Sequence, residues 1–472
     1  MPALAARVTL AALAVTLCLP HAGSAQVAAV DAVVERFLTE EKAGGLAVAV
    51  MKGDDVVHMK GYGFADLEHR VPATEHTVFK LASLSKQFTA MAVMILVERG
   101  TLDLAAPVTR YFPEFPAEGH VPTVGQLINH TSGLDFQEEW SAIMPPATAS
   151  VHASRDLRPA TLAKLFRETH FDFAPGERFR YNNNAYDLAG MLIERVSGMS
   201  YPDFLQKHIW DPLEMRETYF MDAARIIRNR AGGYTLRDEK IVHAPFANLH
   251  RLYASGALGT RISDLLKWQR ALHGSRLVGA ATTKTMMTAG RLKDGTPTPY
   301  GYGLFLTNMS GKAKIEHYGN IGGTRAQLAY YPSAQLTVAI LANTNPLRTD
   351  VLESRIARAV MRMPEATVVE VPMPETKLRS YAATYLVTDA KISHRSVPTE
   401  ITFKDGALYA GRFRLIHTGH DVFVPAGDPY HHYTFTVRDG AAFALTVERE
   451  TRLIADARRV PPGQLVAAPA FR

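Results

Sequence analysis

The segment from residue 83 to residue 99 constrains the fold of this chain more than any other. It contains neither proline nor glycine, and Gly100 follows where a C-terminal helix cap belongs. Between residues 88 and 97 such a helix is apolar on nearly every side, which a surface helix is not. The sequence therefore predicts a buried helix with only its first turn, at Ser83 to Lys86, free to face a cleft.

The length of 472 residues exceeds what one hydrophobic core usually fills, so we expect a large catalytic unit and a smaller appendage. Two β-rich runs, residues 45–51 and 56–61, predict a hairpin. Residues 105–275 are mostly typical of helices and loops and predict a helical subdomain inserted between sheet segments. Strand patterns return at 302–306, 326–331 and 336–342, and a closing helix is expected at 351–363.

Prolines at 364, 372 and 374 support neither a helix nor a central strand and mark a domain boundary. Beyond it, short β-type runs alternate with turns such as Lys404-Asp405-Gly406 and predict a small antiparallel barrel. The expected fold class is α/β (α+β). Residues 26–365 form an antiparallel sheet flanked by helices with an inserted all-helical subdomain, and residues 376–472 form a C-terminal β-barrel.

Residues 1–25 have the pattern of a cleavable signal peptide. Arg7 precedes an apolar run at residues 8–19, and Gly23-Ser24-Ala25 offers a small-residue cleavage site before Gln26. Cys18 leaves a lipid anchor as an alternative, although Leu17 stands where a small residue is expected. The segment predicts a periplasmic or secreted protein, and its removal leaves no cysteine for disulfides or thiol catalysis.

The formal charge is +6, and +5 without Arg7, because residues 1–25 contain no acidic residue. Basic residues are scattered singly and in pairs rather than gathered in a stripe, which disfavours nucleic acid as a partner. No later run of about 18 apolar residues predicts a membrane span. The sequence leaves the oligomeric state open.

Ser83 and Lys86 are three residues apart at a helix start, so a hydroxyl and an amine lie on one helical face. A lysine whose pKa is lowered by partial burial can accept the serine proton, and helix N-terminal N–H groups can stabilise an oxyanion. The alternative interpretation is structural, with Ser83 as an N-cap and Lys86 as a solvated residue of the first turn.

The surrounding segment, Phe79-Lys80-Leu81-Ala82-Ser83-Leu84-Ser85-Lys86, resembles the nucleophile helix of the serine β-lactamase-like superfamily. That superfamily includes class C β-lactamases, DD-peptidases, D-aminopeptidases and esterases. Asn129-His130-Thr131-Ser132-Gly133-Leu134 and Ile209-Trp210-Asp211-Pro212-Leu213-Glu214-Met215 are similar to two further segments, in the family's order. The resemblance implies a β-lactamase/transpeptidase-like fold with Ser83 as the nucleophile.

Phe179-Arg180-Tyr181-Asn182-Asn183 is similar to the family's Tyr-x-Asn element. The resemblance implies that Tyr181 shares the proton transfer with Lys86 and that Asn183 hydrogen-bonds the substrate amide. A phenol beside an ammonium group has a lowered pKa, which suits this role. The alternative is a tyrosine that only packs its ring.

His317-Tyr318-Gly319 is similar to the third family element, on an edge strand that lines the cleft. By this resemblance His317 and Gly319 contact the substrate, and the N–H groups of Asn320 and Ser83 form the oxyanion hole. His417-Thr418-Gly419 is a rival, and Tyr318-Gly319-Asn320 is a second Tyr-x-Asn. Class C β-lactamases carry lysine where His317 stands, and a neutral imidazole is a weaker anchor for a β-lactam carboxylate.

The remaining histidines show no metal-ligand spacing, and no cofactor is expected. The resemblance implies acyl transfer through a Ser83 acyl-enzyme, with a short or D-residue-containing peptide as the favoured substrate of a peptidase or amidase. Carboxylesterase and β-lactamase are alternatives. A non-hydrolytic penicillin- or ligand-binding protein is the alternative from another class, and the barrel is either structural or a shield for the cleft.

Overall fold

The computed structural model describes residues 22–116, 119–135, 166, 169–221, 225–245, 249–386, 392–393, 399–449 and 452–460. The expected signal peptide lies almost wholly outside these residues. From residue 22 onward the chain forms the helix α1 (Ala22–Glu41).

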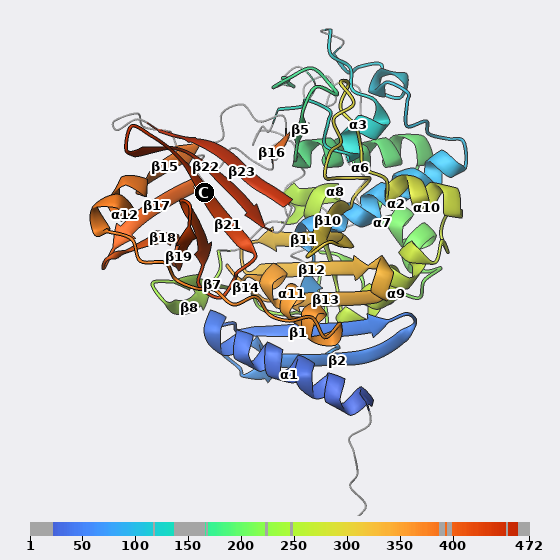
Figure 1. Ribbon diagram of the computed structural model, residues 1–472. Helices are drawn as coiled ribbons and strands as arrows, with labels where there is room; N and C mark the ends of the chain where they lie inside the picture. The colour runs from blue at the N-terminus through green and yellow to red at the C-terminus, as the bar shows by residue number, and fades with distance from the viewer. Residues whose placement is uncertain are drawn as a thin grey trace, which may run out of the picture.

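A seven-stranded sheet forms the centre of the catalytic unit, and all of its strands are antiparallel to their neighbours. The order is β10-β11-β12-β13-β1-β2-β3, so the N-terminal strand pairs with one almost 300 residues later (Figure 1). The strands are β1 (Gly45–Lys52), β2 (Asp55–Asp66), β3 (Val71–Pro72), β10 (Phe305–Met309), β11 (Lys312–Ile321), β12 (Thr324–Tyr331) and β13 (Leu336–Ala342).

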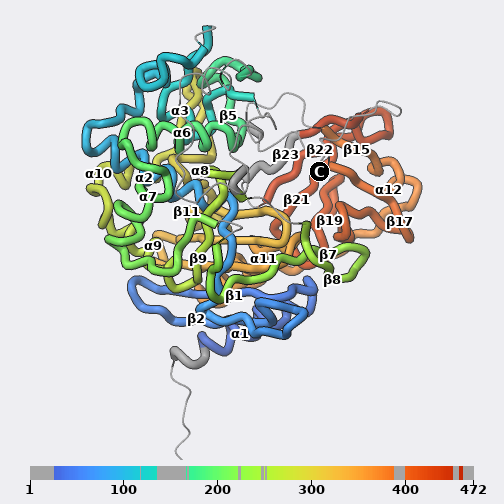
Figure 2. The backbone as a smooth tube through the Cα atoms, turned by 180° about the vertical axis from the view of Figure 1, so that it is seen from behind, coloured from blue at the N-terminus to red at the C-terminus, as the bar shows by residue number. Residues whose placement is uncertain are grey.

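Successive side chains of a strand point to opposite sides of the sheet, and the side chains of β1 are buried on both sides. Leu46, Val48 and Val50 join one apolar core, which also contains residues of α1 and α11 (Thr349–Val360). Ala47 and Ala49 join the larger core on the other face. Figure 1 shows α1 and α11 on one side of the sheet, and Figure 2 shows α9 on the other.

The helical region holds α2 at its centre. Its helices are α2 (Lys86–Glu98), α3 (Val124–Ile128), α6 (Asn183–Ser197), α7 (Tyr201–Leu205), α8 (Tyr253–Gly256), α9 (Ile262–His273) and α10 (Ala280–Met286). Short strands lie among them, which the sequence did not predict: β4 (Phe79–Lys80), β5 (Phe179–Arg180), β6 (Tyr219–Phe220), β7 (Tyr234–Arg237), β8 (Lys240–His243) and β9 (Leu258–Thr260).

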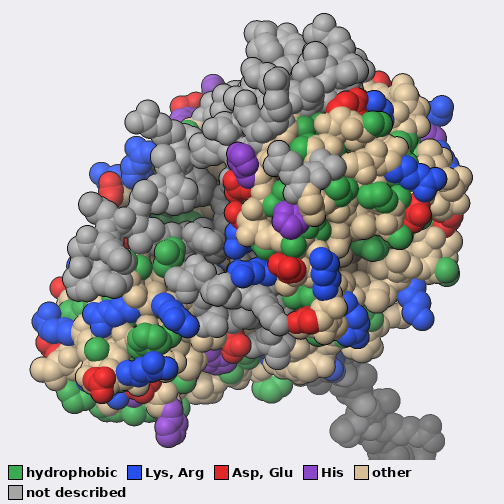
Figure 3. Space-filling model, turned by 90° about the horizontal axis from the view of Figure 1, so that it is seen from above, with side chains coloured by type: hydrophobic (Ala, Val, Ile, Leu, Met, Phe, Trp, Pro, Cys, Tyr) green, Lys and Arg blue, Asp and Glu red, His purple; other side chains and the backbone are tan. Residues whose placement is uncertain are grey.

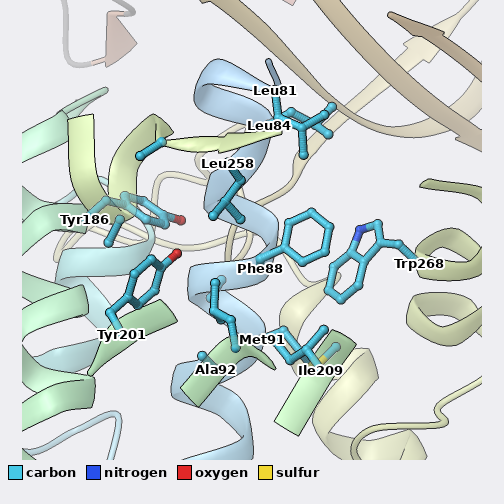
Figure 4. Packing of buried hydrophobic residues seen from close by; sticks show 14 of the residues in the cluster. Leu81, Leu84, Phe88, Met91, Ala92, Tyr186, Tyr201, Ile209, Leu258 and Trp268 are labelled. Carbon is cyan, nitrogen blue, oxygen red and sulfur yellow. The ribbon is translucent and has the colours of Figure 1, made fainter. Parts of the chain in front are cut away.

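The buried helix predicted at 83–99 is present as a 3-10 turn, Ala82–Ser85, followed by α2. Phe88 stacks on Trp268 of α9 with ring centroids 4.1 Å apart (Figure 4). The Trp268 indole donates a hydrogen bond to Gln87 Oε1 at 2.7 Å, and Thr89 donates to the carbonyl of Ala254 at 2.6 Å. The few polar groups of this helix therefore have partners inside the core, as burial requires.

The C-terminal unit is a closed eight-stranded antiparallel barrel, which follows α12 (Glu375–Tyr381). Its strands are β15 (Ala383–Leu386), β17 (Thr399–Lys404), β18 (Ala407–Ala410), β19 (Phe413–Gly419), β20 (Val422–Pro425), β21 (His431–Arg438), β22 (Ala441–Arg449) and β23 (Arg452–Arg459). Closure pairs every edge, so the barrel presents no open strand edge.

Partly buried ion pairs join the barrel to the catalytic unit. Glu41, at the end of α1 and 1% exposed, pairs with Arg348 at 2.6 Å and with Arg412 of the barrel. Arg449 of β22 pairs with Asp350 of α11 at 3.3 Å. These contacts cross the proline-marked boundary.

No helix within the described ranges has the length and apolar character needed to cross a membrane. On the face shown in Figure 3, Lys and Arg side chains are spread among acidic ones and form no single patch. This distribution agrees with the scattered basic residues of the sequence.

Candidate active site

A sharp turn between β4 and α2 presents Ser83. The Leu81 N–H donates to the carbonyl of Leu258 at 2.8 Å, and Ala82 then adopts a positive φ of 47°. Such a conformation costs of order 1–3 kcal/mol in a non-glycine residue and persists only where packing imposes it. Leu81 and Leu84 are fully buried on either side, whereas Ser83 is half-buried. The hydroxyl is thus held at the surface by a buried turn.

Lys86 is fully buried and reaches back toward that hydroxyl. Its Nζ lies 3.2 Å from Ser83 Oγ, 2.8 Å from Asn183 Oδ1 and 2.7 Å from the carbonyl oxygen of Ser255. The i, i+3 spacing on the helix therefore brings the amine and the hydroxyl together, as the sequence predicts. The interpretation of Lys86 as a solvated residue is wrong, since none of its surface is exposed.

The oxygens that Lys86 contacts on Ser83, Asn183 and Ser255 are all uncharged. Asp187 acts one step further away, where its Oδ1 accepts the Ser255 N–H at 3.1 Å and fixes the α8 peptide that faces Lys86. Neither Ser255 nor Asp187 had a sequence signal that pointed to this role.

Tyr181 follows β5 directly and lies over the lysine. Lys86 Nζ is 4.8 Å from the centroid of the Tyr181 ring. Two residues later, Asn183 begins α6 and accepts a hydrogen bond from the same amine. Ser83, Lys86, Tyr181 and Asn183 therefore meet in one place although 100 residues separate them in the sequence.

His130 fixes the backbone on both sides of Tyr181, a role that sequence reasoning did not assign. Its carbonyl accepts the Arg180 N–H at 2.9 Å, and its Nδ1 accepts the Asn182 N–H at 3.0 Å. The imidazole is fully buried, and its centroid lies 4.2 Å from that of the Tyr181 ring. A positive φ of 63° allows His130 to make both contacts.

The third element lies on β11. Strand β10 pairs with this strand only from Lys312 to Glu316, so the described part of β10 does not extend along residues 317–321. A Cβ atom at Gly319 would lie 1.9 Å from the carbonyl oxygen of Leu81. Glycine is required there because β11 runs directly against the turn that carries Ser83. Asn320, the next residue, is exposed.

His317 is fully buried, which was not expected of a substrate-binding residue. Its Nδ1 lies 2.8 Å from the carbonyl of Tyr318, which can only accept, so this nitrogen carries the proton. Nε2 lies 2.8 Å from the hydroxyl oxygen of Tyr300. Burial raises the pKa of Tyr300 well above its ordinary value, which keeps this hydroxyl protonated. The imidazole stands behind the site, with its centroid 6.3 Å from that of Tyr181.

The rival motif His417-Thr418-Gly419 lies on β19 of the barrel, where His417 Nδ1 contacts the carbonyl of Val371 at 2.8 Å. Its position in another unit leaves His317-Tyr318-Gly319 as the candidate for the third element. One described group could share a metal ion, Asp66, Glu68 and His69 at the end of β2. These side chains are half-buried or exposed, and His69 already contacts Asp66 at 3.2 Å.

The barrel unit also reaches the strand that precedes Tyr181. Strand β16 (Ile392–Ser393), between β15 and β17, pairs in parallel with β5, with Ile392 opposite Phe179 and Ser393 opposite Arg180. The C-terminal unit thus contacts the backbone next to the site, which the sequence did not predict.

This fold, with a buried lysine beside a serine at a helix start, is that of the β-lactamase-fold serine hydrolases. The chain belongs to the Beta-lactamase family, whose model matches residues 30–361.

The chain is similar to penicillin-binding proteins and to a D-aminopeptidase. A penicillin-binding protein of Bacillus subtilis (strain 168) is 27% identical over 399 residues, which cover 78% of this chain and 84% of that protein. A D-aminopeptidase of Gluconobacter oxydans (strain 621H) is 26% identical over 371 residues, or 79% of this chain and 67% of the relative. The octameric penicillin-binding protein homologue from Pyrococcus abyssi has a TM-score of 0.65 and 25% identity, covering 90% of this chain and 99% of its own.

Proposed function

We propose that this chain hydrolyses its substrates through an acyl-enzyme on Ser83, with Lys86 as the general base. The distance of 3.2 Å from Lys86 Nζ to Ser83 Oγ, at a fully buried amine, carries this proposal. A neutral amine has a lone pair for the serine proton, which a solvated ammonium lacks.

In the acylation step Lys86 takes the Ser83 proton while Oγ forms a bond to the substrate carbonyl carbon. The N–H groups of Ser83 and Asn320 bind the oxyanion. Tyr181, beside the lysine, passes the proton to the departing nitrogen or oxygen, and the carbonyl re-forms. Water then attacks the ester with the same groups acting in reverse, which frees Ser83.

The other predicted site residues take supporting roles in this mechanism. Asn183 shares the Lys86 amine and offers its amide NH₂ group to a substrate carbonyl. Gly319 lets the edge of β11 approach the serine. His317 is a positioning residue, since its ring is fully buried and hydrogen-bonded to Tyr300.

For the substrate we favour an amide bond in a short or D-residue-containing peptide. The similarity to a protein named D-aminopeptidase supports this choice, as does histidine at the position where class C β-lactamases carry lysine. Esterase and β-lactamase activity are the neighbouring alternatives on the same groups.

We also propose that residues 1–25 are removed on export to the periplasm or beyond, and that the mature chain consists of a hydrolase domain, 26–365, and an accessory barrel, 376–472. Sequencing the N-terminus of the protein secreted by a bacterial host should give Gln26. A start at Met1 in the exported fraction would contradict the signal peptide.

Intact-mass analysis tests the nucleophile. Wild type and Ser83→Ala are exposed to a fluorophosphonate and, separately, to a penicillin. We expect one adduct in wild type and none in Ser83→Ala, with a stable penicilloyl adduct for a peptidase and rapid turnover for a β-lactamase. No labelling of wild type by either reagent would favour a non-hydrolytic binding protein instead.

A further inference from the structure

One side of α6 lies against the amine that the proposed mechanism uses as a base. Asn183, Asp187 and Gly190 are spaced by four and then three residues, so they share one side of this helix. Asn183 Oδ1 lies 2.8 Å from Lys86 Nζ. A Cβ atom at Gly190 would lie 2.4 Å from the side chain of Ala254, so glycine lets α8 pack closely against α6. This side of α6 therefore contacts both the lysine and α8.

Asp187 lies between these two contacts and fixes the backbone of α8. It is 3% exposed, and its Oδ1 accepts the Ser255 N–H at 3.1 Å. The carbonyl of Ser255 in turn accepts a hydrogen bond from Lys86 Nζ at 2.7 Å. A hydrogen bond from a backbone N–H to a carboxylate is stronger than one between neutral groups. The Asp187 contact therefore holds in place a residue whose carbonyl binds the lysine.

The carboxylate is also close enough to act on Lys86 through its charge. Two hydrogen bonds and the backbone of one residue separate Asp187 from Nζ, which places the carboxylate within about 10 Å of the amine. At that distance a negative charge inside a protein strengthens a base by about one pH unit. Asp187 acts on Tyr201 in the same way, since burial raises the pKa of this phenol and the charge of Asp187 adds to the effect.

From these contacts we propose that Asp187 is a positioning residue for the base. It fixes Ser255, whose carbonyl holds Lys86 beside Ser83, and its charge favours the ammonium group that forms when Lys86 takes the serine proton. This inference rests on the proposed role of Lys86. Loss of the charge should make Lys86 a weaker base that gives up its own proton at lower pH.

The test measures the rate at which a fluorophosphonate labels Ser83 between pH 5 and pH 10, by intact mass. In this reaction Ser83 Oγ forms a bond to phosphorus, fluoride leaves and Lys86 takes the proton. The rate therefore falls at low pH, where Lys86 is already protonated. Asp187→Asn keeps an oxygen for the Ser255 N–H, whereas Asp187→Ala does not. Thermal unfolding verifies that each variant is folded, and Asp187→Ser, which is smaller and also uncharged, replaces one that is not.

Glu194→Gln is the matched control. Glu194 follows Asp187 by seven residues on α6, which is roughly 10 Å along the helix. It is 5% exposed, and its Oε1 accepts the Tyr201 N–H at 2.7 Å. The substitution thus removes a buried, hydrogen-bonded carboxylate from the same helix at a greater distance from the lysine.

Two phenols also face Lys86, and either could contribute to the pH dependence. Nζ lies 4.8 Å from the centroid of the Tyr181 ring and 5.4 Å from that of Tyr186. Burial raises the pKa of Tyr186, so this phenol stays neutral over the tested range. Tyr181→Phe removes the other hydroxyl and shows whether the fall in rate belongs to it.

We expect Asp187→Asn to move the fall in rate to lower pH by about one unit and to reduce the rate at high pH by about threefold. Asp187→Ala should show the same shift and a further loss of about tenfold, because Ser255 is no longer held. Glu194→Gln should shift the fall by less than about 0.3 units. Tyr181→Phe should still show the fall at low pH.

An unchanged pH dependence in folded Asp187→Asn and Asp187→Ala, or an equal shift in Glu194→Gln, would overturn this role of Asp187 while the Ser83 mechanism stood. Loss of the pH dependence in Tyr181→Phe would overturn it too, because the fall would then belong to the phenol. Absence of labelling at Ser83 in wild type would overturn the proposed function and this inference with it.

Discussion

Two buried lysines lie on opposite faces of the central sheet, and their surroundings differ. Lys86, fully buried beneath Ser83, contacts the neutral oxygens of Ser83, Asn183 and Ser255. Lys314, on β11 and 4% exposed, faces two carboxylates, Glu316 at 3.1 Å and Glu353 at 3.3 Å.

The difference shows that partners rather than burial decide what a buried amine can do. Burial alone disfavours the charge on Lys314, but Glu316 and Glu353 outweigh it and raise the pKa of this lysine. Lys314 is thus a fixed cation that joins β11 to α11. Lys86 instead contacts the uncharged oxygens of Ser83, Asn183 and Ser255, beside the serine whose proton it is proposed to take.

The largest effect is expected from Lys86→Met. Removal of the base should lower kcat/KM by about 10³-fold or more. The free energy of unfolding should stay the same or rise, since an apolar side chain of similar length replaces a buried amine. Steady-state kinetics and urea unfolding measure the two quantities, with Lys52→Met, which removes the same charge from an exposed residue at the end of β1, as the control. Retained activity in Lys86→Met would show that Lys86 is not the general base, and the two lysines would then not differ in catalytic role.

Lys314→Met should show the opposite pattern. It leaves two buried carboxylates without their cation, so we expect a loss of about 3–5 kcal/mol in unfolding free energy. The kcat of the folded protein should change by less than about threefold. Adding Glu353→Gln should restore part of the stability. A stable but inactive Lys314→Met would show that this cluster belongs to the site.

The same cluster makes a prediction for alkaline pH. Because the folded pKa of Lys314 is raised, its contribution is fully present below the unfolded pKa of about 10.4 and is lost as pH rises through the folded value. Wild type should therefore lose more stability above pH 10.5 than Lys314→Met does. Urea unfolding of wild type and Lys314→Met at pH 8 and pH 11 measures these losses. Equal losses of unfolding free energy in the two proteins would show that the Lys314 amine is not paired with the carboxylates.

Tyr181→Phe tests whether the phenol transfers a proton. The ring contacts with His130 and Lys86 are retained, so only the hydroxyl is lost. We expect about a 10²-fold fall in kcat with little change in stability, as for the loss of a general acid. Rapid-mixing measurement of acylation separates this outcome from a defect in deacylation alone. If Tyr181→Phe kept the wild-type rate, another group would pass the proton to the leaving group.

The smallest effect is expected from His130→Asn. Asparagine tolerates the positive φ and offers an oxygen to the Asn182 N–H, but it removes the ring that packs on Tyr181. We expect about a tenfold loss of kcat, with KM nearly unchanged, from a less fixed Tyr181. His130→Ala should lose more. If the kcat of the double variant Tyr181→Phe/His130→Asn fell by the product of the two single losses, His130 would act independently of Tyr181.

Much of the site could be predicted because its chemistry depends on short spacings. Three residues on a helix place Lys86 beside Ser83, and the order of the motifs indicated Tyr181 and Asn183 before any coordinates. The contacts of Lys86 with Ser255, and of Ser255 with Asp187, had no such signal. They depend on the packing of α6 and α8 against α2, which local patterns do not specify.

Part of the fold could also be predicted from the sequence. The hairpin of β1 and β2, the strands β12 and β13 and a closed C-terminal barrel follow from alternation and turn residues. The pairing of β1 with β13 brings together residues almost 300 positions apart, and the pairing of β16 with β5 joins the two units. Pairings at such distances leave no periodic trace in either strand.

The sequence by itself determined the family, the buried helix and the proximity of Ser83 and Lys86 at its start, because these features depend on residue type and short-range geometry. Only the tertiary structure decided that His317 stands behind the site with both ring nitrogens occupied, that His130 holds the backbone around Tyr181, and that β11 runs against the turn that carries Ser83. The reason is physical: burial and hydrogen-bond partners come from the three-dimensional approach of distant segments, and these set the charge and the accessibility of each side chain.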